Sequence, residues 1–384
     1  MTPGLHQWPA QERVRHGAPV AEALPPELAG AGRVVLATTR SLEGGRIVAA
    51  VRAAIGPRLA ATHAAMRAHS PAEDVAALAR LLVEARAELV VAVGGGSVID
   101  GAKVACLGAW RGLTEPAALL GAAVPRGDTQ PDGPDRAPPV PRIVAVPTTL
   151  SAAEFAPHAG VTDLAAGRKH RLVDPFMVPK AVVLDPAATL ETPADLFLSS
   201  GIRAVDHAAE RWCSRAPQPF SDAVSWQAMR MLAEGLPAVR RDPGDLAARA
   251  ACQQAAWLSV MGGWAGVPVG ASHGLGYILG GARGVPHGIT SCLTLPAVMR
   301  WNEAVNGGRQ REVARLFGGA ATAHGAFRGF VAGLGLPVRL AEVGIAAGEI
   351  PALAALWGGD APIATNPRPV RGAADLEEIL RLAA

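Results

Sequence analysis

Hydrophobic residues in the first half of the chain gather in short unbroken runs that alternate with amphipathic stretches. Residues 32–38 and 89–93 are apolar or β-branched runs of the kind that form strands buried on both faces, and residues 58–62 are a third strand run. Between them, residues 45–55 and 74–86 repeat apolar side chains at helical spacing. Strands that alternate with helices pair in parallel through right-handed crossovers, so this half is predicted to form a doubly wound α/β sheet.

A change in pattern near Pro193 divides the chain. Two further strand runs, at residues 142–149 and 181–186, precede the change, and helical periodicity with Gly- and Pro-rich connections follows it. A length of 384 residues also exceeds what one hydrophobic core usually serves. We therefore expect a nucleotide-binding α/β domain over residues 1–188 and an all-helical substrate and catalytic domain over residues 189–384, with the active site in the cleft between them.

Three successive glycines follow the strand at residues 89–93, and a helical pattern begins at Ser97. Gly94, Gly95 and Gly96 let an anion approach the backbone, and the helix N-terminus that follows them favours negative charge. Ser97 could cap this helix or donate its hydroxyl group to a phosphate. The turn lies at the carboxyl end of a strand, where α/β sheets bind ligands, and a nucleotide diphosphate is the expected ligand. The alternative is a tight turn that needs glycine and binds nothing.

Two other strand ends carry residues suited to the same ligand. Thr148 and Thr149 end a strand run, where their hydroxyl groups are well placed to touch a nucleotide, although Pro-Thr also ends strands that bind no ligand. The run at residues 32–38 leads into Thr39 and Arg40. No acidic residue follows the strand directly, where one could bind the ribose of NAD. Arg40 could instead accept a 2′-phosphate, so NADPH is expected to be tolerated, and the preference between NAD and NADP stays open.

Composition excludes several classes of protein. The formal net charge is only +3 and the arginines are scattered, so neither nucleic acid nor a membrane surface is an expected partner. No apolar run reaches the length of about 18 residues that a membrane-spanning helix needs. The four cysteines lie far apart without the paired spacing of metal sites, which is typical of reduced thiols in a cytoplasmic protein. A small-molecule substrate is therefore the expected partner.

Histidines in the second half mark a candidate catalytic site. Arg203 and His207 lie four residues apart on one face of the helix predicted over residues 201–212. His273 and His287 each stand beside glycine, which allows the close approach of a ligand. A single histidine more often has a structural, hydrogen-bonded role, but three in one half of the chain favour a shared site.

Taken together, these motifs resemble the iron-containing alcohol dehydrogenase family. They occur in the order of that family and cover nearly the whole chain, from about Arg13 to the C-terminus. Residues 147–154 and 366–369 are similar to its maleylacetate reductase branch. The motifs that carry the resemblance are Gly94-Gly-Gly-Ser-Val-Ile-Asp100 with Lys103, Pro147-Thr-Thr149, Val183-Leu-Asp-Pro186, the His207 helix and the two His-Gly pairs.

The resemblance implies a Rossmann-like N-terminal domain, an all-α C-terminal domain in a dehydroquinate synthase-like architecture, and hydride transfer with NAD(H) or NADP(H). It also implies a homodimer. The pyrophosphate would lie against residues 94–97, and Lys169 matches a lysine near the active site of related enzymes. The cofactor-binding residues expected from the motifs and the strand ends are Gly94, Gly95, Gly96, Ser97, Asp100, Thr148, Thr149, Thr39 and Arg40.

The metal site that the resemblance implies is altered in this chain. His207, His273 and His287 match three of the four ligand positions of metal-dependent members, but the fourth, an aspartate in those members, is Arg203. A guanidinium stays protonated and cannot ligate a cation. Asp206 is a poor substitute, because consecutive helical residues point about 100° apart. We therefore favour loss of the metal, although three neutral imidazoles and a water molecule could still hold a divalent ion such as zinc or iron.

Arg203 has two candidate roles. Its fork of donors suits a substrate carboxylate, or it pairs with Asp206 or Glu210 on its own helix or extends into solvent. Without a metal, a protonated histidine with a pKa near neutrality would donate a proton to the developing alkoxide while Arg203 stabilises the negative charge. His273 and His287 are both candidates for this general acid, and the sequence does not choose between them.

These inferences predict an NAD(P)-dependent oxidoreductase, similar to maleylacetate reductase, that acts without a metal. Its expected substrate is a small, carboxylate-bearing molecule with a carbonyl group or an activated alkene. One alternative is a metal-dependent alcohol dehydrogenase of the same fold, with iron or zinc. Alternatives of another class are a dehydroquinate synthase-like lyase or cyclase and a nucleotide-binding protein without catalytic activity. Metal analysis separates the first alternative, and the oxidation state of the cofactor after turnover separates the lyase.

Overall fold

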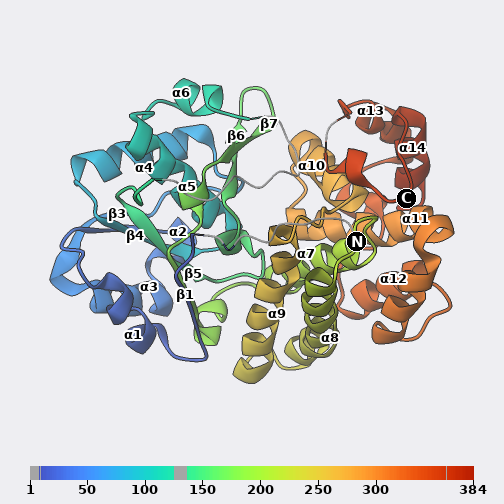
Figure 1. Cartoon of the computed structure of the whole chain (residues 1–384), viewed down its shortest axis with the longest axis horizontal. Helices are drawn as coiled ribbons and strands as arrows, with labels where there is room; N and C mark the ends of the chain where they lie inside the picture. Colours follow the sequence, from blue (N-terminus) through green and yellow to red (C-terminus); the bar gives the residue numbers. More distant parts are fainter. Residues whose placement is uncertain (1–7, 9, 125–135, 360) are drawn as a thin grey trace. The chain divides into compact units, whose positions relative to one another are not determined.

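The computed structural model describes residue 8 and residues 10–124, 136–359 and 361–384. These residues form two compact units, and the first of them, the α/β unit, ends at Pro193. The second, the helical unit, spans Ala194–Ala384. Figure 1 shows a parallel sheet with helices in the first unit, and only helices in the described part of the second. The predicted fold class is therefore confirmed.

The sheet of the α/β unit consists of parallel strands whose central member, β4, precedes the glycine turn. All residues of β4 are buried, and the strand is hydrogen-bonded to β5 on one side and β2 on the other. Burial on both faces explains why this strand is an uninterrupted apolar run in the sequence. In spatial order, the strands are β1 (Arg13–His16), β8 (Ala181–Leu184), β5 (Arg142–Pro147), β4 (Leu89–Gly94), β2 (Val34–Ala37) and β3 (Leu59–His63).

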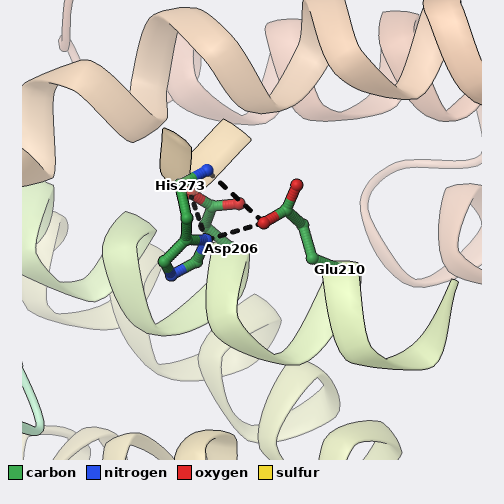
Figure 2. A group of neighbouring side chains, drawn as sticks. All are labelled: Asp206, Glu210 and His273. Atoms are coloured by element: carbon green, nitrogen blue, oxygen red, sulfur yellow. Dashed lines mark hydrogen bonds and ion pairs between the residues drawn. The ribbon is translucent and has the colours of Figure 1, made fainter. Parts of the chain in front are cut away.

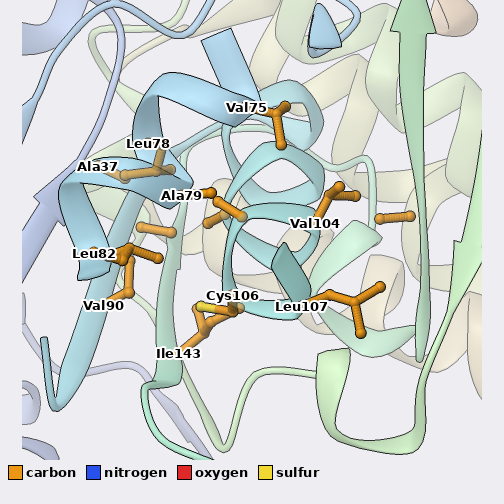
Figure 3. Close-up of a cluster of buried hydrophobic side chains, with 14 of the residues drawn as sticks. Ala37, Val75, Leu78, Ala79, Leu82, Val90, Val104, Cys106, Leu107 and Ile143 are labelled. Atoms are coloured by element: carbon orange, nitrogen blue, oxygen red, sulfur yellow. The ribbon is translucent and has the colours of Figure 1, made fainter. Parts of the chain in front are cut away.

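Helices cover both faces of this sheet. Val35 belongs to one hydrophobic cluster and Val34 to the other, because successive side chains of a strand point to opposite faces. Figure 3 shows the first cluster, where Leu78 of α4 and Val104 of α5 gather with Val90 of β4. The helices of the unit are α1 (Val20–Ala23), α2 (Arg40–Glu43), α3 (Arg46–Ile55), α4 (Ala72–Glu84), α5 (Gly96–Arg111) and α6 (Pro116–Gly121).

Two features of the α/β unit have no counterpart among the predicted strands. β1 pairs only with β8, and its Arg-Val-Arg-His sequence is partly exposed, so it forms an edge strand without an apolar run. A separate antiparallel hairpin consists of β6 (His158–Asp163) and β7 (Arg168–Val173), with Thr162 opposite Lys169. Polar residues occupy many of its positions, and the alternation in β6 is too short to predict a strand.

The helical unit has a core formed by α10, α11, α13 and α14, with Leu275 and Val298 among its buried residues. α11 contains a kink at Asn306, whose backbone angles (φ −138°, ψ 23°) are not helical, and Gly307 and Gly308 follow. Its helices are α7 (Ala194–Trp212), α8 (Pro219–Arg241), α9 (Leu246–Trp264), α10 (Ala271–Arg283), α11 (His287–Leu316), α12 (Ala323–Gly333), α13 (Ile350–Ala354) and α14 (Ala373–Arg381). In the described parts of both units, no helix is sufficiently long and apolar to cross a membrane.

Candidate active site

Close packing explains the three glycines after β4. A Cβ atom on Gly94 would lie 2.6 Å from Val98 Cγ2, and one on Gly95 would lie 3.0 Å from Thr149 Cγ2. A Cβ atom on Gly96 would crowd the loop after β5. These contacts alone would require glycine, so the glycines do not by themselves identify a ligand site.

Two further observations at this turn point to an anionic ligand. α5 begins at Gly96 with Gly95 as its N-cap, and no side chain caps it. Thr149 Oγ1 is buried 3.2 Å from the position of a Cβ atom on Gly95, and it has no hydrogen-bond partner among the described residues. Ser97 lies in the first turn of α5 and is not its cap, which corrects one of its two expected roles. An uncapped helix N-terminus beside an unpartnered hydroxyl group can accept a phosphate.

The order of the strands brings the other predicted cofactor-binding residues to the same edge of the sheet. β5, β4 and β2 are neighbours, so the turns that carry Thr148, Gly94 and Thr39 all lie at adjacent carboxyl ends. Gly94 pairs in register with Pro147, and the Thr148 N–H donates to the Gly94 carbonyl group at 3.0 Å. Arg40 is exposed at the start of α2.

Asp100 of α5 lies between two lysine ammonium groups. Its carboxylate oxygens are 3.7 Å from Lys103 Nζ and 3.9 Å from Lys169 Nζ, and it accepts the Gly160 N–H at 3.2 Å. Lys103 is fully buried and donates to the backbone carbonyl group of His158 at 3.0 Å, so it ties α5 to the hairpin. Lys169 crosses β6 at Gly160, where any Cβ atom would overlap its Cε. The structure thus brings Asp100 and Lys169 together.

The remaining predicted site residues lie in the helical unit. Arg203, Asp206 and Glu210 are buried on one face of α7. The carboxylate of Glu210 accepts three backbone N–H groups at the start of α10, at 2.9, 2.8 and 3.4 Å, and thereby caps that helix. It also binds Nδ1 of His273 at 2.7 Å, as Figure 2 shows.

This contact sets the tautomer of His273. A carboxylate only accepts hydrogen bonds, so Nδ1 donates to Glu210 and Nε2 is left to react. Nε2 is buried and has no hydrogen-bond partner among the described residues. Burial, and then the charges of Arg203 and Arg211, lower the pKa of His273 well below its ordinary value. The expectation of a pKa near neutrality therefore does not hold for His273, whose Nε2 carries a lone pair at neutral pH.

Arg203 pairs with Asp206. Nη1 lies 3.6 Å from Asp206 Oδ2 and donates to Ser291 Oγ at 3.1 Å, whereas Nε and Nη2 make no hydrogen bond to any described residue. Asp206 Oδ2 accepts the hydroxyl groups of Ser291 at 2.6 Å and Ser272 at 2.9 Å. Burial, and then the charge of Glu210, raise the pKa of Asp206, and Arg203 with both hydroxyl groups opposes this shift. Nη1 of the guanidinium is thus engaged within this network, and the edge formed by Nε and Nη2 remains available for a ligand.

The other two histidines contact aromatic rings. The imidazoles of His207 and His273 have centroids 4.7 Å apart and are tilted by 34°. His287 begins α11 and meets Tyr277 edge-on, with 5.9 Å between the ring centroids. Glycine at position 280 makes room for the His287 ring, because a Cβ atom there would lie 3.2 Å from its Cε1.

The side chains of Asp206, Glu210 and His273 do not have the spacing of metal ligands. Within the described residues, the one group of three His, Cys, Asp or Glu side chains whose ligand atoms all lie within 4.8 Å is Asp206, Glu210 and His273. In this group Nδ1 and Oε2 are 2.7 Å apart, whereas ligands about 2.1 Å from a tetrahedral zinc ion lie about 3.4 Å apart. Arg203 adds a permanent positive charge 3.6 Å from Asp206. The group is a hydrogen-bonded network with a cation already beside it.

Sequence reasoning did not select Asp206 and Glu210 as site residues. Their signal is a spacing of four residues, with Arg203 three positions before the first carboxylate. On an exposed helix this spacing is an ordinary solvated pattern of charges. It becomes informative only because the same face of α7 is buried.

The chain is similar to known proteins in both sequence and fold. Residues 11–186 match the family model described as iron-containing alcohol dehydrogenase, and residues 197–384 match the model of the C-terminal part of the Fe-containing alcohol dehydrogenase family. Maleylacetate reductase from Rhizobium sp. strain MTP-10005 is 30% identical over 329 residues, which are 85% of this chain and 83% of that protein. Dehydrogenase FUM7 of Gibberella moniliformis is 33% identical over 300 residues, 74% of this chain and 70% of its own. The crystal structure of the Rhizobium maleylacetate reductase superimposes with a TM-score of 0.81 at 26% identity, covering 100% of this chain and 98% of that one.

Proposed function

Because the chain belongs to the iron-containing alcohol dehydrogenase family and is an oxidoreductase, we propose that it uses NADH or NADPH, without a metal ion, to reduce a small carboxylate-bearing substrate. The reducible group is a carbonyl or an activated alkene. The family resemblance of the motifs is confirmed, and maleylacetate reductases are among the relatives. One observation carries the proposal: the buried cation of Arg203 occupies the position at which the resemblance expects a metal-binding aspartate.

Arg203 suits the carboxylate of the substrate. Its Nη1 is fixed by Ser291 and Asp206, which orients the planar guanidinium. The Nε and Nη2 edge has no hydrogen bond within the described residues and is the edge that forms paired bonds with a carboxylate. A guanidinium held in this way would attract an oxo acid and would also stabilise negative charge on the oxygen being reduced.

The α/β unit supplies the groups expected to bind the cofactor. The uncapped N-terminus of α5 and the unpartnered Thr149 hydroxyl group suit the diphosphate. The exposed Arg40 at the end of β2 suits a 2′-phosphate, which favours NADPH. When bound, the reduced nicotinamide supplies the hydride.

His273 is the residue to which we assign the proton. Glu210 holds Nδ1, so Nε2 is the atom that gives a proton to the oxygen of the reduced product and takes one from an alcohol in reverse. The low pKa of His273 makes its neutral form dominant at pH 7, so it must gain a proton from solvent before each reduction. The orienting carboxylate favours His273 over His287 for this role.

The test measures whether activity requires a metal ion and whether it requires a charged carboxylate on the substrate. Purified full-length protein is dialysed against EDTA, its metal content is measured, and oxidation of NADH and NADPH is followed with an oxo acid and with the methyl ester of the same acid. We expect full activity without metal and at least about a hundredfold preference for the acid, since a paired bond between two charged groups is the strong kind of hydrogen bond. Arg203→Gln should remove that preference, with Arg300→Gln, on the exposed part of α11, as the matched control.

Three results would overturn the proposal. Activity that requires near-stoichiometric zinc or iron would make the protein an ordinary metal-dependent alcohol dehydrogenase. Equal rates with acid and ester would remove the role of Arg203. Conversion of substrate without net oxidation of cofactor would place the reaction among lyases or cyclases.

A further inference from the structure

Two successive residues before α4 adopt a backbone conformation that side chains rarely accept. His69 has φ 65° and Ser70 has φ 53°, so both lie in the left-handed region, and neither is glycine. Such residues persist only where surrounding contacts hold them. The His69–Ser70 turn therefore needs an explanation in its contacts.

The contacts of the His69–Ser70 turn lead to two distant parts of the α/β unit. Towards α5, the His69 N–H donates to Ser97 Oγ at 2.9 Å, and Ser70 Oγ donates to the Ser97 carbonyl group at 2.8 Å. Towards the hairpin, Thr162 Oγ1 donates to the His69 carbonyl group at 2.6 Å, and the Thr162 N–H donates to that of Ser70 at 3.0 Å. The turn is a link between β6 and the first turn of α5.

This link determines where the Ser97 hydroxyl group can point. Ser97 Oγ accepts the His69 N–H, so its own proton must be directed away from that bond, and no described residue accepts it. Ser97 is the second residue of α5, beside the uncapped N-terminus, and the buried, unpartnered Thr149 Oγ1 lies 3.2 Å from the position of a Cβ atom on the N-cap residue Gly95. Two hydroxyl groups without an acceptor thus flank one helix N-terminus, which is the donor arrangement a phosphate needs.

We propose that Thr162 and Ser70 are positioning residues that hold the Ser97 hydroxyl group as a donor to the diphosphate of the nucleotide. The inference rests on the proposed function, because it assumes that the turn after β4 binds the cofactor phosphates. The hairpin supports it independently, since Thr162 is paired in register with Lys169, whose Nζ lies 3.9 Å from Asp100 of the same helix. The β6–β7 hairpin therefore positions both Ser97 and Asp100, which lie near the start of α5.

The experiment measures the Kd of two probes, ADP and adenosine, for the full-length protein and its variants by calorimetry. Ser97→Ala should weaken ADP binding about tenfold, the effect of losing one hydrogen bond to a charged group. Thr162→Val keeps the shape of the side chain but removes its hydroxyl group, and it should weaken ADP binding about fivefold or more. Thr162→Ser is the matched control and should retain the affinity within twofold. Adenosine, which lacks phosphate, should bind all the variants equally.

A double variant separates positioning from general loosening of the structure. Thr162→Val should add nothing to the effect of Ser97→Ala, because both act through one hydroxyl group. Equal weakening of ADP and adenosine, additive effects, or Thr162→Val binding ADP like the unaltered protein would each overturn the inference. If Thr162→Val melts early, Ser70→Ala replaces it, with the same expected loss for ADP alone. Failure of the unaltered protein to bind ADP would instead overturn the proposed cofactor site.

Discussion

Glu210 and His273 resemble the carboxylate–histidine pairs that enzymes use to fix one imidazole nitrogen. The 2.7 Å contact at Nδ1 defines the tautomer, and the same carboxylate is held by three backbone N–H groups at the start of α10. A misplaced carboxylate would therefore disturb both a helix cap and a catalytic nitrogen. The lowered pKa of His273 can be tested through the pH dependence of the reaction rate.

The direction of the pH dependence follows from that pKa. Reduction needs a proton on Nε2, and at a pH above the pKa of His273 the protonated fraction rises tenfold for each unit that the pH falls. We expect kcat for reduction to increase from pH 8 to pH 6 and kcat for alcohol oxidation, which uses the neutral form, to stay level. His273→Gln should abolish the slope, and His324→Gln should keep it, because the imidazole of His324 on α12 binds the Pro296 carbonyl group of α11. A reduction profile with its midpoint at about 6.5, the ordinary histidine value, would contradict the assignment.

At the scale of elements, sequence pattern predicts the parts that are buried uniformly. β2, β4, β5 and β8 are apolar on both faces and were predictable, as were the helices with an apolar stripe. The pattern does not predict β1 or the β6–β7 hairpin, because many of their residues are polar and their structure depends on tertiary contacts. For the carboxylates of α7, the sequence offers Asp206 and Glu210 only as partners of Arg203, since spacing alone does not reveal which face of a helix is covered.

The glycine turn gives a prediction at this scale. Gly95→Ala places a methyl group 3.0 Å from Thr149 Cγ2 and 3.2 Å from its Oγ1, so the two turns must separate or the threonine must rotate. We expect ADP affinity to fall about tenfold or more, with a smaller loss of thermal stability of about 1–3 kcal/mol from overpacking. Gly121→Ala in α6 is the matched control, because nothing lies within 4 Å of its added methyl group. Unchanged ADP affinity in Gly95→Ala would place the phosphates elsewhere.

At the scale of the whole molecule, one buried carboxyl group in the α/β unit, that of Glu154, lowers the stability of the fold when it is charged. Glu154 is 1% exposed, and its Oε2 has no hydrogen-bond partner among the described residues. Burial raises the pKa of Glu154 to about 7, because the charged form is poorly solvated there. Each unit has its own core, so unfolding need not be a single transition and midpoints are the appropriate measure.

Glu154 predicts how stability changes with pH. Its pKa is about 7 when folded and 4.5 in the reference state, so its favourable contribution is complete below about pH 4.5 and is lost as the pH rises through 7. The shift corresponds to on the order of 3 kcal/mol. Glu154→Gln should therefore unfold at higher urea than the unaltered protein at pH 8, and the gap should shrink towards pH 5. Glu115→Gln, at an exposed position, should show no such trend; a constant gap for Glu154→Gln would show that Glu154 does not titrate in this range.

The crossing of Lys169 over Gly160 has a consequence for how this enzyme can change under selection. A side chain at position 160 must displace the end of the lysine, because the two compete for the same space across β6. Losing the lysine first removes a cation from the neighbourhood of Asp100. The two positions are therefore coupled by contact: a mutational library that varies residue 160 alone must displace Lys169 in every variant, whereas one that varies residues 160 and 169 together also samples pairs that divide the same space differently.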